Sequence, residues 1–560
     1  MWAMLTEPGG NIAQVVRGGD ARPTEYGEVF TQQWIVELIL DLCGYVPDID
    51  LTAKRVLEPA VGSGAFLKAV LARLLDSRTK HAPDSTWDEL EPAILALDLQ
   101  PSHVRTCRQL VVQQLTAAGC PAEIATQLAV SWVHKSDFLL DDSIDDVDYV
   151  VGNPPYIRIE DLSPELLAAY RRACTTMTGR SDVYIGFYER GLELLRENGS
   201  LGFICADRWM RNQYGRRLRE KIAKGGFALE SCLIMHDVDA FDNEVSAYPA
   251  ITILTRKPQE EVIVGEATAS FNADSAARFS AWALNRSDAT LRTAGVRGSR
   301  LPHWHSTADS WPDGSPETLA WLEMIQDRYP PLEDREAGTL IGIGVATGAD
   351  AVYVTRDADA AERERMLPLA MSADVKSGSF NWTGHYLVNP WDEDGLVDLE
   401  QWPKLADYLN RNAIAIRRRS ISKRSPLKWY RTIDRVRMSL TNRPKLLLED
   451  MKRRTHPVLE PGGHYPHHNL YYLVSDVWDL EALGGLLLSE VVERQVAAYC
   501  VKMRGGTLRF QAQYLRRVHA PKPELIRDSV MNDLIAAFRK RDRAAATAAA
   551  LAAYNLEELP

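Results

Sequence analysis

The 560-residue sequence predicts an α/β protein, with a parallel sheet in its first half and a mixed α/β domain in its second. Apolar runs of strand length alternate with helical patterns up to about residue 257, which is typical of a parallel sheet covered by helices. Each run ends in glycine or polar residues, and a second group of short strands opens at Leu340. We therefore expect a sheet domain at 1–257, a connector at 258–335, a second domain at 336–521 and a helical tail at 522–560.

The predicted sheet begins with a strand at 55–57, which leads into the loop Glu58–Gly64 and a helix from Ala65 to Leu75. The carboxyl ends of parallel strands meet at one edge of a sheet, so the residues that follow them should line one crevice. The next strands are predicted at Ala93–Leu97, Ala129–Val133, Val147–Val151 and Leu201–Cys205, with a helix at Tyr184–Arg196; Asp98, Asp137 and Asn153 follow the first three of these strands.

The ends of the domains are predicted from composition. Residues 258–335 contain Ser, Asp and Pro without a clear period, which indicates a connector with some structure. Alanine dominates residues 544–553, and alanine has the highest helix propensity. That stretch is expected to be a helix that packs as a cap.

Composition limits the classes to which the chain can belong. No apolar run approaches the roughly 20 residues that cross a bilayer, and the first residues lack the basic and apolar segments of a secretory signal. Seven scattered cysteines without a CxxC pair indicate reduced thiols rather than a disulfide framework or a zinc site. We expect a cytoplasmic protein with no membrane role.

Charge is distributed unevenly along the chain. The net charge is −11, yet residues 401–454 hold 16 Lys and Arg against four Asp and Glu. Phosphates attract such residues, and the interleaved rings of Trp402, Tyr408, Trp429 and Tyr430 can stack on or wedge against bases. The segment favours a nucleic-acid partner, and a basic surface that only faces solvent is the alternative. The basic residues expected at the interface are Arg417, Arg418, Arg419, Lys423, Arg424 and Lys428.

The loop Glu58–Gly64 has the composition of a ligand-binding turn. Its glycines permit a close approach of the backbone to a ligand, and the helix that follows offers free amide donors. It is neither a P-loop nor a GxGxxG motif. Asp98 can accept hydrogen bonds from a ribose, although it lies 34 residues after Gly64, so an insertion is expected around 80–91. A purely structural turn and a helix-capping Asp98 are the alternatives.

The tetrapeptide Asn153-Pro154-Pro155-Tyr156 follows an apolar strand. Consecutive prolines stiffen the chain and keep Asn153 out of helical geometry. The result is a rigid ledge that presents an Asn side-chain oxygen, a proline carbonyl and an aromatic ring. Two acceptors and a ring suit a planar group with an exocyclic amine, such as adenine. A proline-rich turn without function is the alternative.

Taken in order, these segments resemble the TaqI-like, gamma-class DNA adenine-N6 methyltransferases, which use S-adenosylmethionine. Tyr26–Thr31 resembles the opening segment of that family, Leu57–Leu67 its cofactor loop, and Asn153–Tyr156 its catalytic tetrapeptide. Residues 341–350, 429–430, 443–446 and 504–521 resemble parts of its target-recognition domain. The resemblance implies a Rossmann-like class I methyltransferase sheet followed by a C-terminal mixed α/β target-recognition domain that binds double-stranded DNA.

The resemblance also implies a role for each matching residue. Thr31 would lie beside the methionine part of the cofactor, and Asp98 would bind its ribose. The other implied cofactor residues are Glu58, Ala60, Gly62, Gly64, Asp137, Phe138 and Asn153. The implied catalytic residues are Asn153, Pro154, Pro155 and Tyr156, with Phe241 as the loosest match, packing against the extruded base on the face opposite Tyr156.

Other functions share part of this pattern. Similar tetrapeptides occur in methyltransferases that act on RNA guanine or on protein glutamine amides, and these generally lack a large basic domain. A non-catalytic DNA-binding specificity subunit is a third possibility, against which the intact Asn153 and Tyr156 argue. We expect a nucleoid-associated monomer, with any restriction endonuclease on a separate chain, because no nuclease motif stands out.

The stretch Gly462–His468 contains three histidines in seven residues. Such a stretch can bind metal, but no cysteine or carboxylate cluster accompanies it in the sequence. We expect a turn with exposed histidines and no metal site.

Overall fold

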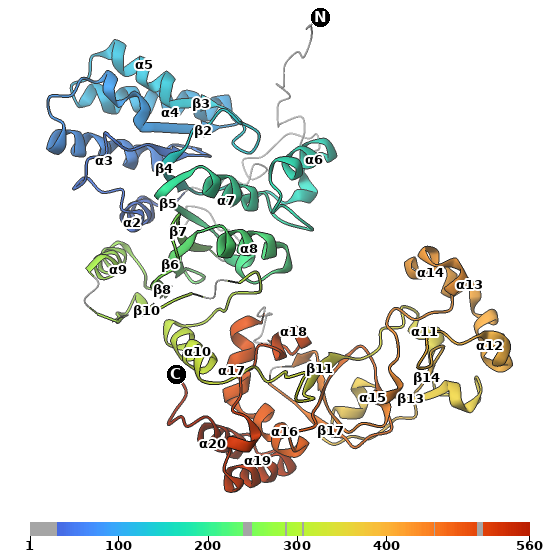
Figure 1. Ribbon diagram of the computed structural model, residues 1–560. Helices are drawn as coiled ribbons and strands as arrows, with labels where there is room; N and C mark the ends of the chain where they lie inside the picture. The colour runs from blue at the N-terminus through green and yellow to red at the C-terminus, as the bar shows by residue number, and fades with distance from the viewer. Residues whose placement is uncertain (1–30, 239–248, 286–287, 305–306, 453, 501–507) are drawn as a thin grey trace, which may run out of the picture. The chain divides into compact units, whose positions relative to one another are not determined.

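The computed structural model describes residues 31–238, 249–285, 288–304, 307–452, 454–500 and 508–560. The chain divides into two compact units, one up to Ala320 and one from Trp321 onward (Figure 1). Each unit buries its own apolar clusters, as independent domains do.

The first unit is built on a ten-stranded sheet with the order β3-β2-β1-β4-β5-β7-β6-β8-β10-β9. Strands β1 to β5 pair in parallel, and β7 runs antiparallel between β5 and β6. The order reverses between β1 and β4, which is the place where open α/β sheets bind ligands. The strands are β1 (Val56–Glu58), β2 (Ile94–Asp98), β3 (Val133–Lys135), β4 (Val147–Gly152), β5 (Leu195–Ala206), β6 (Ala228–Ile234), β7 (Pro249–Thr255), β8 (Val262–Ala267), β9 (Thr290–Arg292) and β10 (Val296–Leu301).

Helices cover both faces of this sheet (Figure 1). Val147, Val150 and Val151 of β4 are all fully buried, because a parallel strand between two helical layers has no solvent side. One face packs on α2 (Gln33–Cys43), α3 (Ala65–His81), α4 (Pro101–Ala117), α5 (Ala122–Trp132) and α9 (Ala273–Asn285), and the other on α6 (Pro164–Ala173), α7 (Tyr184–Glu193) and α8 (Arg216–Lys224).

The structure differs from the sequence prediction in three stretches. The helix predicted at Tyr184–Arg196 ends at Glu193, and β5 already begins at Leu195. Residues 129–132 complete helix α5, and the strand begins only at Val133. Residues 258–335 are not a connector, because β8, β10 and β9 extend the sheet and the boundary between units falls within α10 (Pro316–Arg328). Their pattern was weak because Gly265 and Gly298 stand where apolar residues would signal a strand. A Cβ on either glycine would come within 2.7 Å of a ring of α9.

The second unit contains two four-stranded sheets and a group of helices. One sheet has the order β11-β19-β15-β17 and is antiparallel; the other has the order β12-β14-β13-β18. The strands are β11 (Leu340–Ile343), β12 (Val354–Thr355), β13 (Met366–Ala370), β14 (Tyr386–Val388), β15 (Lys445–Glu449), β16 (Met451–Lys452), β17 (Val458–Glu460), β18 (Tyr465–Pro466), β19 (Leu470–Val474) and β20 (Leu508–Arg509).

The helices of the second unit form two groups. The first sheet buries its apolar side chains against α16 (Leu480–Leu488), α17 (Glu490–Tyr499), α19 (Asp528–Lys540) and α20 (Arg543–Ala553). The alanine-rich stretch is thus helical, as predicted, and packs against α16 and α19. The others are α11 (Asp350–Tyr353), α12 (Pro403–Arg411), α13 (Ala413–Arg417), α14 (Ser420–Arg424), α15 (Met438–Thr441) and α18 (Ala512–Leu515).

Two predictions from composition can be compared with the fold. All seven cysteines are buried and none forms a disulfide, in agreement with the prediction of reduced thiols. In the ranges that the structure describes, no helix combines the length and apolarity needed to cross a membrane.

Candidate active site

Three strand ends meet at the point where the sheet order reverses. Glu58 ends β1, Asp98 ends β2 and Asn153 directly follows β4. The pairing of Leu57 with Val150 sets β4 beside β1 in parallel register. Glu58, Asp98 and Asn153 therefore lie at one edge of the sheet.

The glycine loop is held by the residue at the end of the neighbouring strand. The backbone amide of Gly62 donates to Asp98 Oδ2 over 2.9 Å, and the amide of Gln100 donates to Asp98 Oδ1 over 2.7 Å. Gly62 and Gly64 have φ of 52° and 90°, a region that favours glycine. A Cβ on Gly64 would also lie 3.2 Å from the Cys107 sulfur, so side chains are excluded here for two reasons.

Glu58 is a buried carboxylic acid, 4% exposed, at the start of this loop. Burial raises its pKa well above the ordinary value, and the nearby Asp98 raises it further. Among the described residues, Glu58 Oε2 has no hydrogen-bond partner. A buried carboxyl oxygen without a partner is costly, and a bound cation or amine would satisfy it.

Asp137 lies just beyond β3 and is held from two sides. The amide of Leu139 donates to Oδ1 over 3.0 Å, and the hydroxyl of Tyr170 donates to Oδ2 over 2.9 Å. Burial raises the pKa of Asp137 despite these bonds. The Phe138 ring lies against Phe187, with centroids 5.2 Å apart, and is part of the core.

Nothing in the sequence indicated that Tyr170 contacts a predicted site residue. It lies on α6, beyond the tetrapeptide Asn153–Tyr156, and its helical spacing gives no indication of a partner 33 residues earlier. Only the packing of α6 on the sheet brings the phenol to Asp137.

The ledge after β4 is fixed at both ends. Asn153 Nδ2 donates to Thr31 Oγ1 over 3.2 Å, so the structure brings these two predicted residues together. At the far end, the Val183 amide donates to the Ile157 carbonyl over 2.9 Å and ties the ledge to the start of α7. Pro154 is buried between these two attachments. Ala60 and Pro155 are only partly buried.

Tyr156 is a half-buried ring at this edge of the sheet. Burial of its hydroxyl raises the pKa well above the ordinary value, and the hydroxyl also lies against Cys205 of β5. The centroid of the ring is 6.5 Å from that of Tyr184. Phe241, and residues 26–30 of the opening segment, lie outside the described residues.

The basic segment forms a surface of the second unit around α13 and α14. Arg418, Lys423, Arg424 and Lys428 are exposed there, and no ion pair holds them among the residues that the structure describes. Arg417 is exposed as well, with its guanidinium 4.2 Å from the ring centre of Trp429. We call these five residues the basic face.

Arg419 does not belong to the basic face. Its guanidinium donates to the carbonyls of Thr347 (2.6 Å), Arg431 (2.7 Å) and Trp429 (3.1 Å). The prediction of a phosphate contact is corrected here, because these bonds turn the side chain into its own domain. Spacing in the sequence could not separate Arg419 from Arg418, since both follow the same helix.

The predicted aromatic contacts also need correction. Trp429 is buried, 8% exposed, and Trp402, Tyr408 and Tyr430 pack against the same core cluster. The Tyr408 hydroxyl donates to the Val352 carbonyl over 2.6 Å. Trp429 is therefore a core residue that contacts Arg417, and the other three rings are half-buried against the same core cluster.

Comparison with known proteins identifies the family. Residues 122–231 match the Eco57I restriction-modification methylase family. The chain is 42% identical over 535 residues to the type II methyltransferase M.PaeR7I of Pseudomonas aeruginosa, covering 95% of this chain and 92% of that protein. It is 40% identical to M.XhoI of Xanthomonas vasicola (96% and 98% covered) and 36% identical to M.BstVI of Geobacillus stearothermophilus (91% of each). The chain therefore belongs to the type II DNA methyltransferases of restriction-modification systems, whose methyl donor is S-adenosylmethionine.

Proposed function

We propose that this enzyme methylates the N6 amine of an adenine within a specific sequence of double-stranded DNA. The observation that carries the proposal is the position of Asn153-Pro154-Pro155-Tyr156 directly after β4, next to the strand that leads into the glycine loop. Acceptors for an amine and a cradle for the methyl donor then share one edge of the sheet.

Asn153 and Pro154 would hold the reacting amine. The Asn153 side-chain oxygen and the Pro154 carbonyl accept its two N–H groups, which favours a lone pair on nitrogen over delocalisation into the ring. Bound S-adenosylmethionine supplies a methyl carbon attached to a positively charged sulfur. Held by Asn153 and Pro154, the nitrogen lone pair would face that carbon; the methyl group would pass from sulfur to nitrogen, and the product amine would release one proton to solvent. Such a transfer depends mainly on positioning.

Glu58, Gly62 and Asp98 support a cofactor site. The unpartnered Glu58 oxygen suits the ammonium of the methionine part, because a charge-assisted hydrogen bond would relieve its burial. Asp98 is held in place by two backbone amides and can accept further hydrogen bonds from a ribose. Asp137, fixed by Tyr170, would accept from the adenine amine of the cofactor.

The target base would leave the duplex before it reacts. Its amine cannot be reached while the base is stacked and paired, so we expect extrusion into the crevice. The half-buried Tyr156 ring would lie on one face of the base and Phe241 on the other.

The basic face would contact DNA phosphates. Its exposed cations form no ion pairs within the described ranges and so remain available for an anionic partner. Leu427, 94% exposed between Arg424 and Lys428, suits an apolar contact in a groove. We expect one enzyme molecule to act as a monomer at the nucleoid, with a separate restriction endonuclease sharing its target sequence.

The nearest alternative substrates are RNA guanine and a protein glutamine amide. The exposed cations of the basic face, which form no ion pairs within the described ranges, favour a nucleic acid over a protein. Methyltransferase relatives over the full chain length favour DNA over RNA and also argue against a non-catalytic specificity subunit.

The deciding experiment maps modified bases in DNA from cells that express the enzyme. We expect N6-methyladenine at a single recurring sequence, and its loss in cells that express Asn153→Ala. Methylation on cytosine, or an unmodified genome from active wild-type enzyme, would contradict the proposal.

A further inference from the structure

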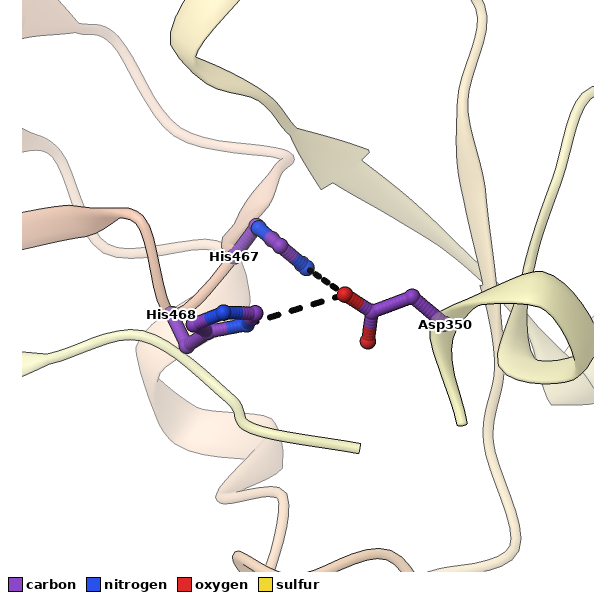
Figure 2. Close-up of side chains that lie close together, drawn as sticks. All are labelled: Asp350, His467 and His468. Atoms are coloured by element: carbon purple, nitrogen blue, oxygen red, sulfur yellow. Dashed lines mark hydrogen bonds and ion pairs between the residues drawn. The ribbon is translucent and has the colours of Figure 1, made fainter. Parts of the chain in front are cut away.

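Asp350, His467 and His468 form a cluster in the second unit. Asp350 begins α11, and the two histidines lie between β18 and β19 (Figure 2). The sequence predicted exposed histidines without a carboxylate. Instead, His467 is 2% exposed, and a carboxylate 117 residues earlier in the chain lies against it.

The three side chains point toward one another (Figure 2). His467 Nε2 lies 3.1 Å from Asp350 Oδ2, and His468 Nδ1 lies 4.0 Å from the same oxygen. One donor atom from each residue falls within 4.8 Å of the others. Ligands of a tetrahedral zinc ion, each about 2.0 Å from the metal, lie about 3.3 Å apart. Side-chain adjustments of the order of 1 Å would bring these atoms to that spacing.

A hydrogen-bonded Asp–His pair accounts for only part of the cluster. It explains Asp350 and His467, whose separation is that of a hydrogen bond. It leaves His468 Nδ1, which is buried, beyond hydrogen-bond distance from Asp350 and without another partner among the described residues. A metal ion between His468 Nδ1 and the Asp350 carboxylate would account for their separation of 4.0 Å and would give the buried nitrogen a partner.

The surroundings hold the donors in place. The Thr347 hydroxyl donates to the other Asp350 oxygen, which orients the carboxylate as outer partners do in metal sites. The His467 amide donates to the Ala370 carbonyl and the His468 amide to the Val345 carbonyl. Gly344 permits this approach, since a Cβ there would lie 2.2 Å from the His467 carbonyl oxygen.

We propose that Asp350, His467 and His468 bind one divalent transition-metal ion of the zinc type, with water completing the shell. Two imidazole nitrogens and one carboxylate oxygen suit zinc, cobalt or nickel, whereas magnesium and calcium prefer oxygen ligands. Because β18 and β19 belong to different sheets, the ion would fasten the start of α11 to the junction of the two sheets. None of the three residues belongs to the proposed methyl-transfer site.

The test uses the untagged full-length protein, stripped with chelator and dialysed against zinc or cobalt. We expect about one metal ion per chain, a cobalt spectrum with nitrogen ligands, and a higher melting temperature with zinc. His468→Ala and Asp350→Asn should lose all three, and both positions are exposed enough for the fold to survive.

The matched control is His464→Asn. His464 lies in the same stretch, but its ring pairs with Glu460 and not with the cluster. The His464→Asn variant should bind metal as the wild type does. The proposal is overturned if the wild type takes up no more metal than His468→Ala, or if the two variants retain wild-type stoichiometry. Methylation activity plays no part in these readouts, so their failure is distinct from failure of the proposed function.

Discussion

Asn153 Nδ2 donates to Thr31 Oγ1 over 3.2 Å and so joins the residue after β4 to the residue that precedes α2 by two positions. An amide whose nitrogen is held by a hydroxyl has its oxygen directed the other way. The cofactor side and the base side of the proposed site are thus coupled through one hydrogen bond, and the two residues can be tested separately.

Asn153→Ala should abolish methyl transfer, because the amine loses one of its two acceptors. Thr31→Val removes only the bond that orients the amide, so we expect a loss of 10-fold or so in turnover. For comparison, removal of a preorganised hydrogen-bond donor from an oxyanion hole costs about 10²- to 10³-fold in turnover. Single-turnover rates with an oligonucleotide duplex measure both effects, and cofactor affinity serves as the control. If Asn153→Ala kept the turnover of the wild type, Asn153 would not be an acceptor for the reacting amine.

Glu58 gives a pH dependence to cofactor binding. Burial and Asp98 raise its pKa, so the free enzyme binds a proton on Glu58 at a pH where an ordinary glutamate is ionised. An ammonium group is attracted by the ionised form, and therefore affinity for S-adenosylmethionine should rise with pH until Glu58 is deprotonated. Calorimetric titration from acid to neutral pH should show this rise in the wild type. Glu58→Gln should bind more weakly and lose the dependence, and an unchanged pH profile would contradict it.

The basic face should control the salt dependence of DNA binding. Changing Arg418, Lys423 and Lys428 to Glu removes three cations, and each phosphate contact contributes about 0.9 to the slope of log K against log salt. We expect the slope to fall by about 1 to 3, with cofactor affinity unchanged. A slope equal to that of the wild type would exclude this face from the DNA interface.

Arg419 provides the contrast within the same segment. Arg419→Ala removes a guanidinium that donates to three carbonyls of its own domain. Buried carbonyls left without donors cost about 1–3 kcal/mol each, so we expect a lower melting temperature and the same salt slope. If Arg419→Ala had normal stability but a reduced salt slope of DNA binding, Arg419 would instead be a DNA contact.

Asp207 should stabilise the first unit in a pH-dependent way. This residue is 1% exposed and contacts Arg211 and His236, the latter over 2.7 Å. Burial alone would raise its pKa, but the hydrogen bonds and charges of His236 and Arg211 outweigh burial and lower it. The contribution is therefore present above the unfolded pKa of about 3.9 and is lost as the pH falls through the folded pKa.

Asp207→Asn leaves Arg211 with a longer contact to Asp313, over 3.6 Å. We expect a loss of about 3 kcal/mol at neutral pH, as for other broken buried pairs. Urea unfolding at several pH values measures this difference, which should begin to shrink below about pH 4, where the unfolded chain takes up a proton on Asp207, and should be lost as the pH falls through the lowered pKa of the folded state. A difference that stays constant with pH would assign the effect to packing.

Phe241 is implicated by family resemblance alone. Phe241→Ala should weaken the capture of the extruded base while leaving cofactor affinity intact. A fluorescent adenine analogue at the target position brightens when it leaves the stack, so its signal on enzyme binding should fall in the variant. A signal equal to that of the wild type would separate Phe241 from the base.

The sequence by itself determined the parallel sheet, the glycine loop and the ledge at Asn153–Tyr156. These are local patterns: an apolar strand, a polar end and a turn residue lie within about ten positions, so short-range sterics and burial fix them. Asp98 and Asn153 could be chosen because parallel strands place their carboxyl ends together whatever the loops between them do.

Tertiary structure alone decided which side chains meet across long loops. Nothing in the sequence pairs Tyr170 with Asp137, separates Arg419 from Arg418, or brings Asp350 to His467 and His468. Strands β8 and β10 could not be predicted, because each contains a glycine where an apolar residue would complete the strand pattern. These glycines leave room for the rings of α9. Such contacts depend on packing between elements far apart in the chain, and packing has no period that a sequence displays.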